Sequence, residues 1–261
     1  MTSDFLSLHR PGDPLLMPNA FDAGSAKVLA SMGFAALATT SSGFAATLGR
    51  RDGEVSRDEA IAHAAALTEA AGLPINADLE NGFAATLEDV AHTYASAHTA
   101  GIAAGSIEDF TGDKADPIFD AAAATERVRA AVEAKGELTL TARAENYLYD
   151  RADLADTIAR LQSFQEAGAD VLYAPGMRDL DEIATLCREV DRPVNVLLLP
   201  GGPEVAQLAE AGVARISVGG AFLFNAYAGL VEAADDLLAG STAYFDRLGP
   251  GRAAFDRATE G

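Results

Sequence analysis

The chain has 261 residues, and 49% of them are apolar, which is enough to bury the core of one large domain. Its 39 acidic residues outnumber its 19 basic residues, and the formal net charge of −20 argues against nucleic acid or an anionic membrane as a partner. The single cysteine, Cys187, excludes an internal disulfide and indicates a cytoplasmic protein.

Short apolar runs alternate along the chain with longer alanine-rich stretches, a pattern typical of βα units around a parallel sheet. The predicted strands are 15–20, 34–40, 74–80, 105–110, 138–144, 170–175, 193–199 and 215–220. Two of the intervening helices are expected to begin at capping sequences, Ser56–Glu59 and Thr86–Asp89. Eight such units predict an α/β fold, a (β/α)8 TIM-type barrel that occupies 1–261 as a single domain and ends in a helical tail from about 240.

Charged side chains collect where the predicted strands end. Asp78 and Glu80 lie two positions apart in "NADLENGF" and so share one face of their strand, although like charges repel. The other charged residues at or just after strand ends are Asp22, Asp52, Glu108, Asp109, Arg143 and Glu145. Since the carboxyl ends of barrel strands meet on one face, these acids should form a ring. A ring of oxygen ligands predicts Mg²⁺ or Mn²⁺, unless each acid only caps a helix or pairs with an arginine.

No lysine or histidine lies at a predicted strand end. Lys27, Lys114 and Lys135 all lie elsewhere, so a Schiff-base aldolase would lack its nucleophile. The four histidines also lie outside these ends, which argues against zinc and against a histidine base.

The segments around these strand ends resemble a known superfamily. In chain order they read "PNAFDAGSA", "GFAALATTSSGFAATLGRRDGE", "PINADLENGF", "SIEDF" and "TARAENY". Together, over roughly 12–230, they resemble the isocitrate lyase/phosphoenolpyruvate mutase superfamily. The resemblance implies a barrel enzyme that uses Mg²⁺ and acts on a small 2-oxo acid or dicarboxylate.

The resemblance also assigns roles to individual residues. It implies metal binding, directly or through water, by Asp52, Asp78, Glu80 and Glu108. It implies that the substrate carboxylate is held by backbone N–H groups of Thr40, Ser41 and Ser42.

Three residues are expected to be catalytic: Arg143, Glu145 and Asp52. By the resemblance, Arg143 contacts the substrate carboxylate or oxyanion, and Asp52 holds a metal-bound water. Glu145 and Asn146, just past Arg143, either hold the departing group or only shape their loop.

The chain departs from the lyases of this superfamily at three places. The loop "TGDKADPIFDAA" (111–122) has neither cysteine nor histidine where those lyases carry a catalytic cysteine. Pro175 in "LYAPG" stands where they offer a glutamate, and Glu80 replaces the usual aspartate. The chain is thus expected to be a member without the lyase cysteine.

Four functions follow as hypotheses. The first is a Mg²⁺-dependent enzyme that cleaves or forms a C–C bond next to a 2-oxo acid through an enolate, such as an oxo-acid lyase or oxaloacetate decarboxylase. The second is a phosphonopyruvate or phosphoenolpyruvate mutase or hydrolase. The third is an aldolase or isomerase that binds phosphate at "LPGGP" (199–203) and "VGG" (218–220). The fourth is a non-catalytic 2-oxo acid binder.

Two segments outside the strand ends carry further expectations. The loop 111–122 should be a mobile lid, with Lys114 reaching the substrate and Pro117, Ile118 and Phe119 as its apolar tip. The apolar stretch 221–238 would need cover. By the resemblance, this eighth helix is exchanged between subunits of a homo-oligomer, a tetramer or a dimer.

Overall fold

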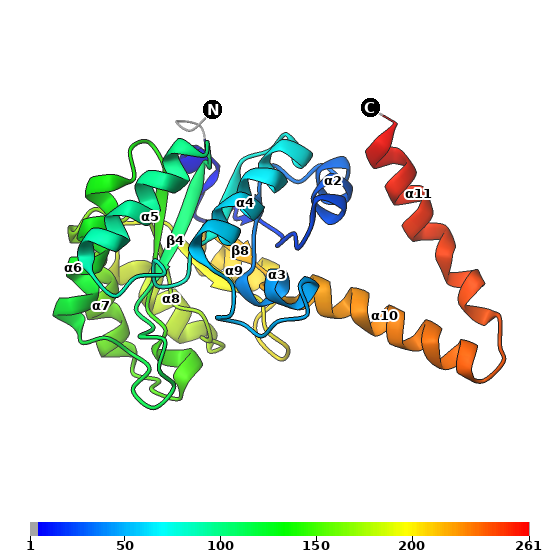
Figure 1. The fold of residues 1–261 in the computed structure, drawn as a ribbon. Coiled ribbons are helices and arrows are strands. Elements are labelled where there is room, and N and C mark those ends of the chain that lie inside the picture. The colour runs from blue at the N-terminus through cyan, green and yellow to red at the C-terminus, as the bar shows by residue number, and fades with distance from the viewer. Residues whose placement is uncertain (1–4, 261) are drawn as a thin grey trace.

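The computed structural model describes residues 5–260, in which eight parallel strands alternate with helices (Figure 1). The strands are β1 (Leu15–Leu16), β2 (Leu37–Ala38), β3 (Ile75–Asp78), β4 (Ala104–Glu108), β5 (Thr139–Arg143), β6 (Val171–Tyr173), β7 (Val194–Leu197) and β8 (Arg215–Ser217). They are hydrogen-bonded in the order β1-β8-β7-β6-β5-β4-β3-β2. Seven of them lie within the predicted segments, β4 begins one residue before its predicted segment, and each is shorter than predicted.

The sheet curls until its two edge strands meet. Just past β1, Asn19 forms an isolated parallel bridge with Ala38 of β2. Two backbone hydrogen bonds accompany the bridge, from Ala20 N to Ala38 O (2.8 Å) and from Ala38 N to Pro18 O (3.0 Å). Closure of this kind leaves no free edge, and it confirms the predicted (β/α)8 TIM-type barrel.

Helices follow the strands around the barrel. They are α2 (Ala23–Ser31), α3 (Ser41–Thr47), α4 (Arg57–Ala71), α5 (Leu87–Thr99), α6 (Ala121–Ala134), α7 (Leu154–Glu166), α8 (Leu180–Glu189), α9 (Val205–Glu210), α10 (Ala221–Leu238) and α11 (Leu248–Thr259), with short 3-10 turns η1 (Leu6–Leu8), η2 (Asn146–Tyr149) and η3 (Ala243–Arg247). The predicted capping box is present, because Ser56 and Glu59 each accept from the other's backbone N–H. Thr86 caps α5 by accepting from Asp89 N. No described helix is long and apolar enough to cross a membrane.

The barrel interior changes character along its axis. At the amino-terminal end of the strands, Phe5 is fully buried and packs with Leu15, Met17 and Ala104. Further along the strands, inward positions carry polar side chains, among them Asn76 and Ser106. Since side chains on a strand alternate between faces, the residues two positions on also point inward, toward the carboxyl ends. An apolar plug at the amino-terminal end therefore supports a layer of polar side chains. Above the polar layer lies the charged layer, formed by Asp78, Glu108 and Arg143 at the carboxyl ends of β3, β4 and β5.

The last helices leave the barrel (Figure 1). Tyr227 on α10 donates to Ala46 O of α3 (3.1 Å), but beyond this point α10 extends into solvent, and α11 turns back to contact α2. Large apolar side chains of α10 are exposed, including Phe224 (54%), Leu230 (65%) and Leu238 (86%). The tail from about 240 contains η3 and α11, and α10 presents an apolar face that a single chain leaves uncovered.

Candidate active site

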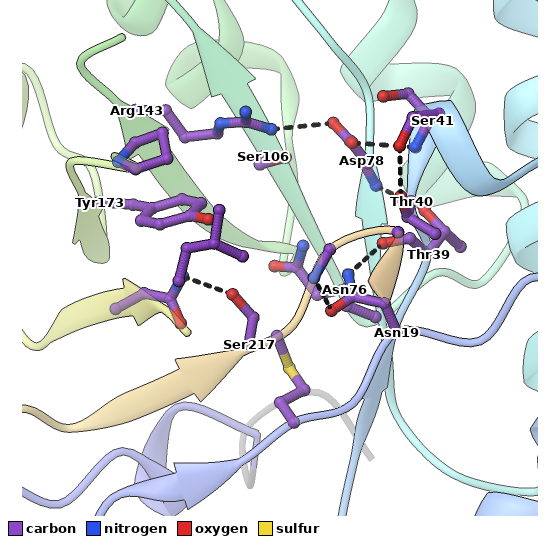
Figure 2. A pocket seen from close by; sticks show the side chains of 18 of the residues that line it. Asn19, Thr39, Thr40, Ser41, Asn76, Asp78, Ser106, Arg143, Tyr173 and Ser217 are labelled. Atoms are coloured by element: carbon purple, nitrogen blue, oxygen red, sulfur yellow. Dashed lines mark hydrogen bonds and ion pairs between the residues drawn. The ribbon is translucent and has the colours of Figure 1, made fainter. Parts of the chain in front are cut away.

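A cavity of about 220 Å³ opens at the carboxyl ends of the strands. It is lined by six of the residues predicted for the site: Thr40, Ser41, Ser42, Asp52, Asp78 and Arg143. Figure 2 shows Asp78 and Arg143 facing each other across this cavity, with Ser41 beside Asp78. The structure therefore brings together residues that are up to 103 positions apart in the sequence (40 to 143).

Arg143, at the end of β5, lies among three carboxylates. Its Nη1 is 3.1 Å from Asp78 Oδ1, its Nη2 is 3.2 Å from Glu108 Oε2, and its Nε is 2.8 Å from Glu145 Oε1. Burial alone would lower the pKa of Arg143, but the fields of Glu145, Glu108 and Asp78 raise it well above its ordinary value. Arg143 is therefore a permanently charged group at the centre of the acids.

Asp78 joins this cluster to the start of α3. Its Oδ2 accepts from Ser41 N (3.1 Å), and its own N–H donates to Thr39 Oγ1 (2.7 Å). Thr40 is the N-cap of α3 and accepts from Gly43 N (3.3 Å). The first turn of α3 is thereby fixed with Ser41 N–H directed into the charged layer.

Glu80 has a left-handed backbone, with φ of 47°, which is uncommon for a residue with a long side chain. Burial, followed by the charges of Asp78 and Asp52, raises its pKa to about 8. Burial, and to a lesser extent Asp78, also raises the pKa of Asp52. Such backbone strain and crowded negative charge are features that persist at functional sites.

The acidic donors fit a hard divalent cation by their chemistry. Burial raises the pKa values of Glu80, Glu108 and Asp52, and neighbouring carboxylates raise them further. Glu108 has Arg143 as an ion-pair partner (3.2 Å), whereas Glu80 and Asp52 form no ion pair with a described residue. Among residues 5–260, no three acidic, histidine or cysteine side chains are grouped so that all could contact one ion. An ion bound here would therefore have at most two direct ligands of these types, with water completing its coordination.

Five of the predicted residues lie outside the lining of the cavity, namely Glu80, Glu108, Lys114, Glu145 and Asn146. Glu145 is buried, and its N–H donates to Asp109 Oδ1 (2.8 Å). Asn146 is also buried, and its Nδ2 donates to Asp156 Oδ2 (2.6 Å). Asn146 therefore shapes its loop in this structure, and its contact with substrate stays a prediction.

The loop 111–122 differs from the expected lid in one respect. Ile118 is buried and forms an antiparallel bridge with Phe110, and Arg160 Nη1 donates to Phe119 O (2.7 Å). The expectation of an apolar tip was wrong, because these apolar side chains anchor the loop and leave 112–116 as its exposed tip. Lys114 lies on that tip, outside the lining of the cavity.

Several residues of the cavity wall were not predicted from the sequence. They are Asn19, Asn76, Tyr173, Asn195, Arg215 and Ser217. A usable signal exists for some of them, since Asn76 precedes Asp78 by two positions on one strand and thus shares its inward face. Polar residues at alternate positions before a charged strand end mark a cavity that continues into the barrel.

The sequence model of the phosphoenolpyruvate phosphomutase family matches residues 5–238. The chain belongs to this family. A solved Burkholderia cenocepacia protein, named as a candidate lyase or mutase, is 46% identical with a TM-score of 0.93, and the match covers 100% of this chain and 95% of that one.

Two further relatives carry more specific names. An oxaloacetate decarboxylase of Pseudomonas savastanoi pv. phaseolicola is 32% identical over 70% of this chain and 64% of its own length. A solved 2,3-dimethylmalate lyase, a member of the PEP mutase/isocitrate lyase superfamily, is 26% identical with a TM-score of 0.87, covering 99% of this chain and 95% of that one. These findings confirm the superfamily expected from the sequence, and with it an enzyme of the lyase and mutase type.

Proposed function

We propose that the protein is a Mg²⁺-dependent or Mn²⁺-dependent enzyme that breaks the C–C bond one carbon removed from the carbonyl of a small 2-oxo acid (C3–C4), so that the bonding electrons pass to the 2-oxo oxygen and form an enolate. The observation that carries this proposal is one cavity shared by Asp78, Arg143 and the first residues of α3. It combines a carboxylate, a fixed cation and backbone N–H groups within a buried, polar space. These are the groups that an enolate-forming reaction needs.

The substrate carboxylate would lie at the start of α3, next to Thr40, Ser41 and Ser42. Arg143 would donate to the 2-oxo oxygen as negative charge builds there, and its position among three carboxylates keeps it charged and immobile. The metal ion, when bound by Asp78 with help from Asp52, Glu80 and Glu108, would polarise the same carbonyl. Orientation and charge stabilisation then supply the catalysis.

A second function differs only in the bond that breaks. The family is named for a phosphomutase, so C–P chemistry on phosphonopyruvate or phosphoenolpyruvate is the alternative. The oxaloacetate decarboxylase among the relatives favours C–C cleavage. Both reactions use the same 2-oxo acid head and the same enolate, and only the group at the far end distinguishes them.

The proposal is tested with a panel of substrates in the presence of Mg²⁺. Oxaloacetate, 2-methylisocitrate, 2,3-dimethylmalate and phosphonopyruvate are incubated with the enzyme, and pyruvate or another 2-oxo acid product is measured with and without EDTA. Release of product that EDTA abolishes and Mn²⁺ restores is expected for at least one of the C–C substrates. Turnover of phosphonopyruvate alone would support the alternative, and binding without turnover would overturn the enzyme assignment for this panel.

The uncovered face of α10 supports a homo-oligomer. Exposed apolar residues such as Phe224, Leu230 and Leu238 form a stretch that a second copy of the chain could bury. We expect a tetramer or dimer in which α10 packs against a neighbouring barrel, in a cytoplasmic enzyme. Light scattering at micromolar concentration is the measurement, and a monomeric mass would contradict it; Leu230→Glu should then shift an oligomer toward the monomer.

A further inference from the structure

Arg215 is the largest fully buried side chain of the described residues, and it lies in the wall of the active-site cavity. It is only 2% exposed, begins β8 and lines the cavity together with Asn195 and Ser217. The interiors of TIM barrels are ordinarily filled by bulky apolar side chains. A guanidinium in this layer is therefore unusual.

The partners of Arg215 are all neutral. Its Nε donates to Asn195 Oδ1 (3.0 Å), its Nη2 to Thr141 Oγ1 (3.1 Å) and its Nη1 to His9 Nε2 (3.2 Å). His9 Nδ1 lies 3.2 Å from Phe5 O, so Nδ1 carries the hydrogen and Nε2 accepts. Burial, reinforced by the charge of Arg215, lowers the pKa of His9 to about 3, which keeps His9 uncharged.

No carboxylate compensates this charge within residues 5–260. Arg143 has three acidic partners, and Arg160 has Asp109 and Asp156, but Arg215 forms no ion pair with any described residue. Burial lowers the pKa of Arg215 to about 9, so it still carries its charge at neutral pH. A buried, unpaired charge is costly, and an anionic ligand in the adjoining cavity would balance it.

The two ends of the cavity are chemically different. Asp78, Arg143 and the start of α3 occupy the open end of the cavity. Arg215 lies at the start of β8 and Ser217 at its end, so the guanidinium of Arg215 places a positive charge deeper in the barrel. The ring centroid of Tyr173 is 5.3 Å from Arg143 Cζ. In Figure 2, Ser217 and Asn76 lie on the side of Tyr173 and Asp78 that faces away from Arg143 and Ser41.

We propose that Arg215 binds a second anionic group of the substrate, a distal carboxylate, at the floor of the cavity, so that the enzyme selects 2-oxo dicarboxylates over 2-oxo monocarboxylates. This inference rests on the proposed function, because it assumes that the 2-oxo acid head lies at the open end. Asn195 and Ser217, beside Arg215, can add neutral hydrogen bonds to the same group.

The test compares ligands that differ in one charge. The pairs are oxaloacetate with 2-oxosuccinamate, and 2-oxoglutarate with 2-oxoglutaramate, in which an amide replaces the distal carboxylate at equal length. Equilibrium binding with Mg²⁺ present is measured by calorimetry. For at least one pair, the wild-type enzyme should bind the dicarboxylate about 10- to 100-fold more tightly than the amide, the range for a charge-assisted hydrogen bond.

Variants then assign the preference to one residue. Arg215→Gln should reduce the ratio to about one, and Arg215→Lys should retain part of it. Arg127→Gln is the matched control, since Arg127 is also buried and donates only to neutral groups, the carbonyls of Asn81 and Ala84, but does not line the cavity. If a variant fails to fold, the ratio of dicarboxylate affinity to amide affinity in the wild-type enzyme still tests whether the cavity prefers a second negative charge.

The outcomes are distinct. Equal binding of acid and amide by the wild type, or an unchanged ratio in Arg215→Gln, would overturn the role of Arg215 and leave the proposed function standing. A loss of thermal stability in Arg215→Gln with an unchanged ratio would likewise show a purely structural arginine. Preferred binding of the dicarboxylate without any turnover would support this inference and overturn the proposed catalysis. Failure to bind any of the four ligands would overturn this inference, and turnover of the substrate panel would still decide the proposed function.

Discussion

Arg143 and Arg215 line one cavity, yet the chain treats them in opposite ways. Arg143 lies within ion-pair distance of three carboxylates, with N–O separations of 2.8 to 3.2 Å. Arg215 has only an amide, a hydroxyl and a neutral imidazole as partners. The same residue type is thus neutralised by the protein at the mouth of the barrel and left positive inside it.

The difference shows what each arginine is available for. Arg143 is held on several sides, so it can orient a reacting group but contributes little net positive charge to attract one. Arg215 has only neutral partners, so its positive charge is available to an anionic ligand that enters the cavity. A cavity with excess negative charge at one end and a free cation at the other selects a ligand by the position of its charges as well as by its size.

Removal of Asp78 should have the largest effect, because it takes away both a partner of Arg143 and the proposed direct metal ligand. We expect Asp78→Ala to lower kcat/KM by at least about 1,000-fold and to weaken Mn²⁺ binding. Circular dichroism should show an intact fold. Asp13→Ala is the control, because Asp13 is exposed and pairs only with Arg10 at the surface. Full activity of Asp78→Ala would refute the metal assignment.

The free energies of unfolding of two matched variants measure the difference between the surroundings of Arg143 and those of Arg215. Arg143→Met leaves Asp78, Glu108 and Glu145 without their cation, and we expect it to lower the free energy of unfolding by about 3–5 kcal/mol. Arg215→Met breaks three hydrogen bonds but also removes an unpaired charge, so its cost should be about 0–2 kcal/mol. Urea denaturation at one protein concentration gives both values. Equal costs would mean that Arg215 has a compensating partner after all.

Acid sensitivity tests the environment of Arg215 through His9. The folded pKa of His9 is lowered to about 3, so the unfolded chain binds the proton first as the pH falls from 6.5. The stability contributed by neutral His9 is complete above pH 6.5 and is lost on acidification toward pH 3, by about 2–4 kcal/mol. His9→Gln should flatten this loss, whereas the exposed His92→Gln should not. Identical pH profiles for both variants would contradict the buried, neutral His9.

Lys114 should give the smallest effect, because it is exposed and its field is screened by salt. If the tip of the loop approaches a dianionic substrate, Lys114→Ala should raise KM about two- to fivefold and leave kcat nearly unchanged. Steady-state kinetics at low and high ionic strength would measure this. An effect on kcat alone would indicate that the loop limits a later step, such as product release.

The fold could be predicted from the sequence, and so could the part of the site at the carboxyl ends of the strands, because both rest on local rules. Alternation of strands and helices gave the barrel, and strand ends of a barrel meet, which placed Asp78, Arg143 and Asp52 together. The sequence is compatible with acids that pair with an arginine as well as with acids that bind a metal. In the structure Asp78, Glu108 and Glu145 each pair with Arg143. Sequence spacing alone could not decide between an arginine and a metal as the neighbour of each acid.

The deeper part of the cavity, around Arg215, could not be predicted, since it depends on contacts between segments that are distant in the sequence. Arg215 meets His9 across 206 positions, and this contact exists only because the amino-terminal segment plugs the barrel. The anchoring of Phe119 by Arg160 is similar: the two residues are 41 positions apart, and nothing in the loop sequence indicates it. Such pairs follow from how the closed barrel packs, which no local pattern contains.

The anchored loop at 111–122 has a consequence for protein engineering. Its stem is fixed by the bridge between Phe110 and Ile118 and by the hydrogen bond from Thr111 N to Pro117 O (2.9 Å). The tip 112–116 is exposed, and Asp116 pairs with Arg151 at the surface (3.6 Å). The tip can therefore be exchanged as a cassette, with longer or recharged sequences grafted between Thr111 and Pro117 while the catalytic groups stay in place. A library confined to these five positions would change access to the cavity without redesigning the barrel.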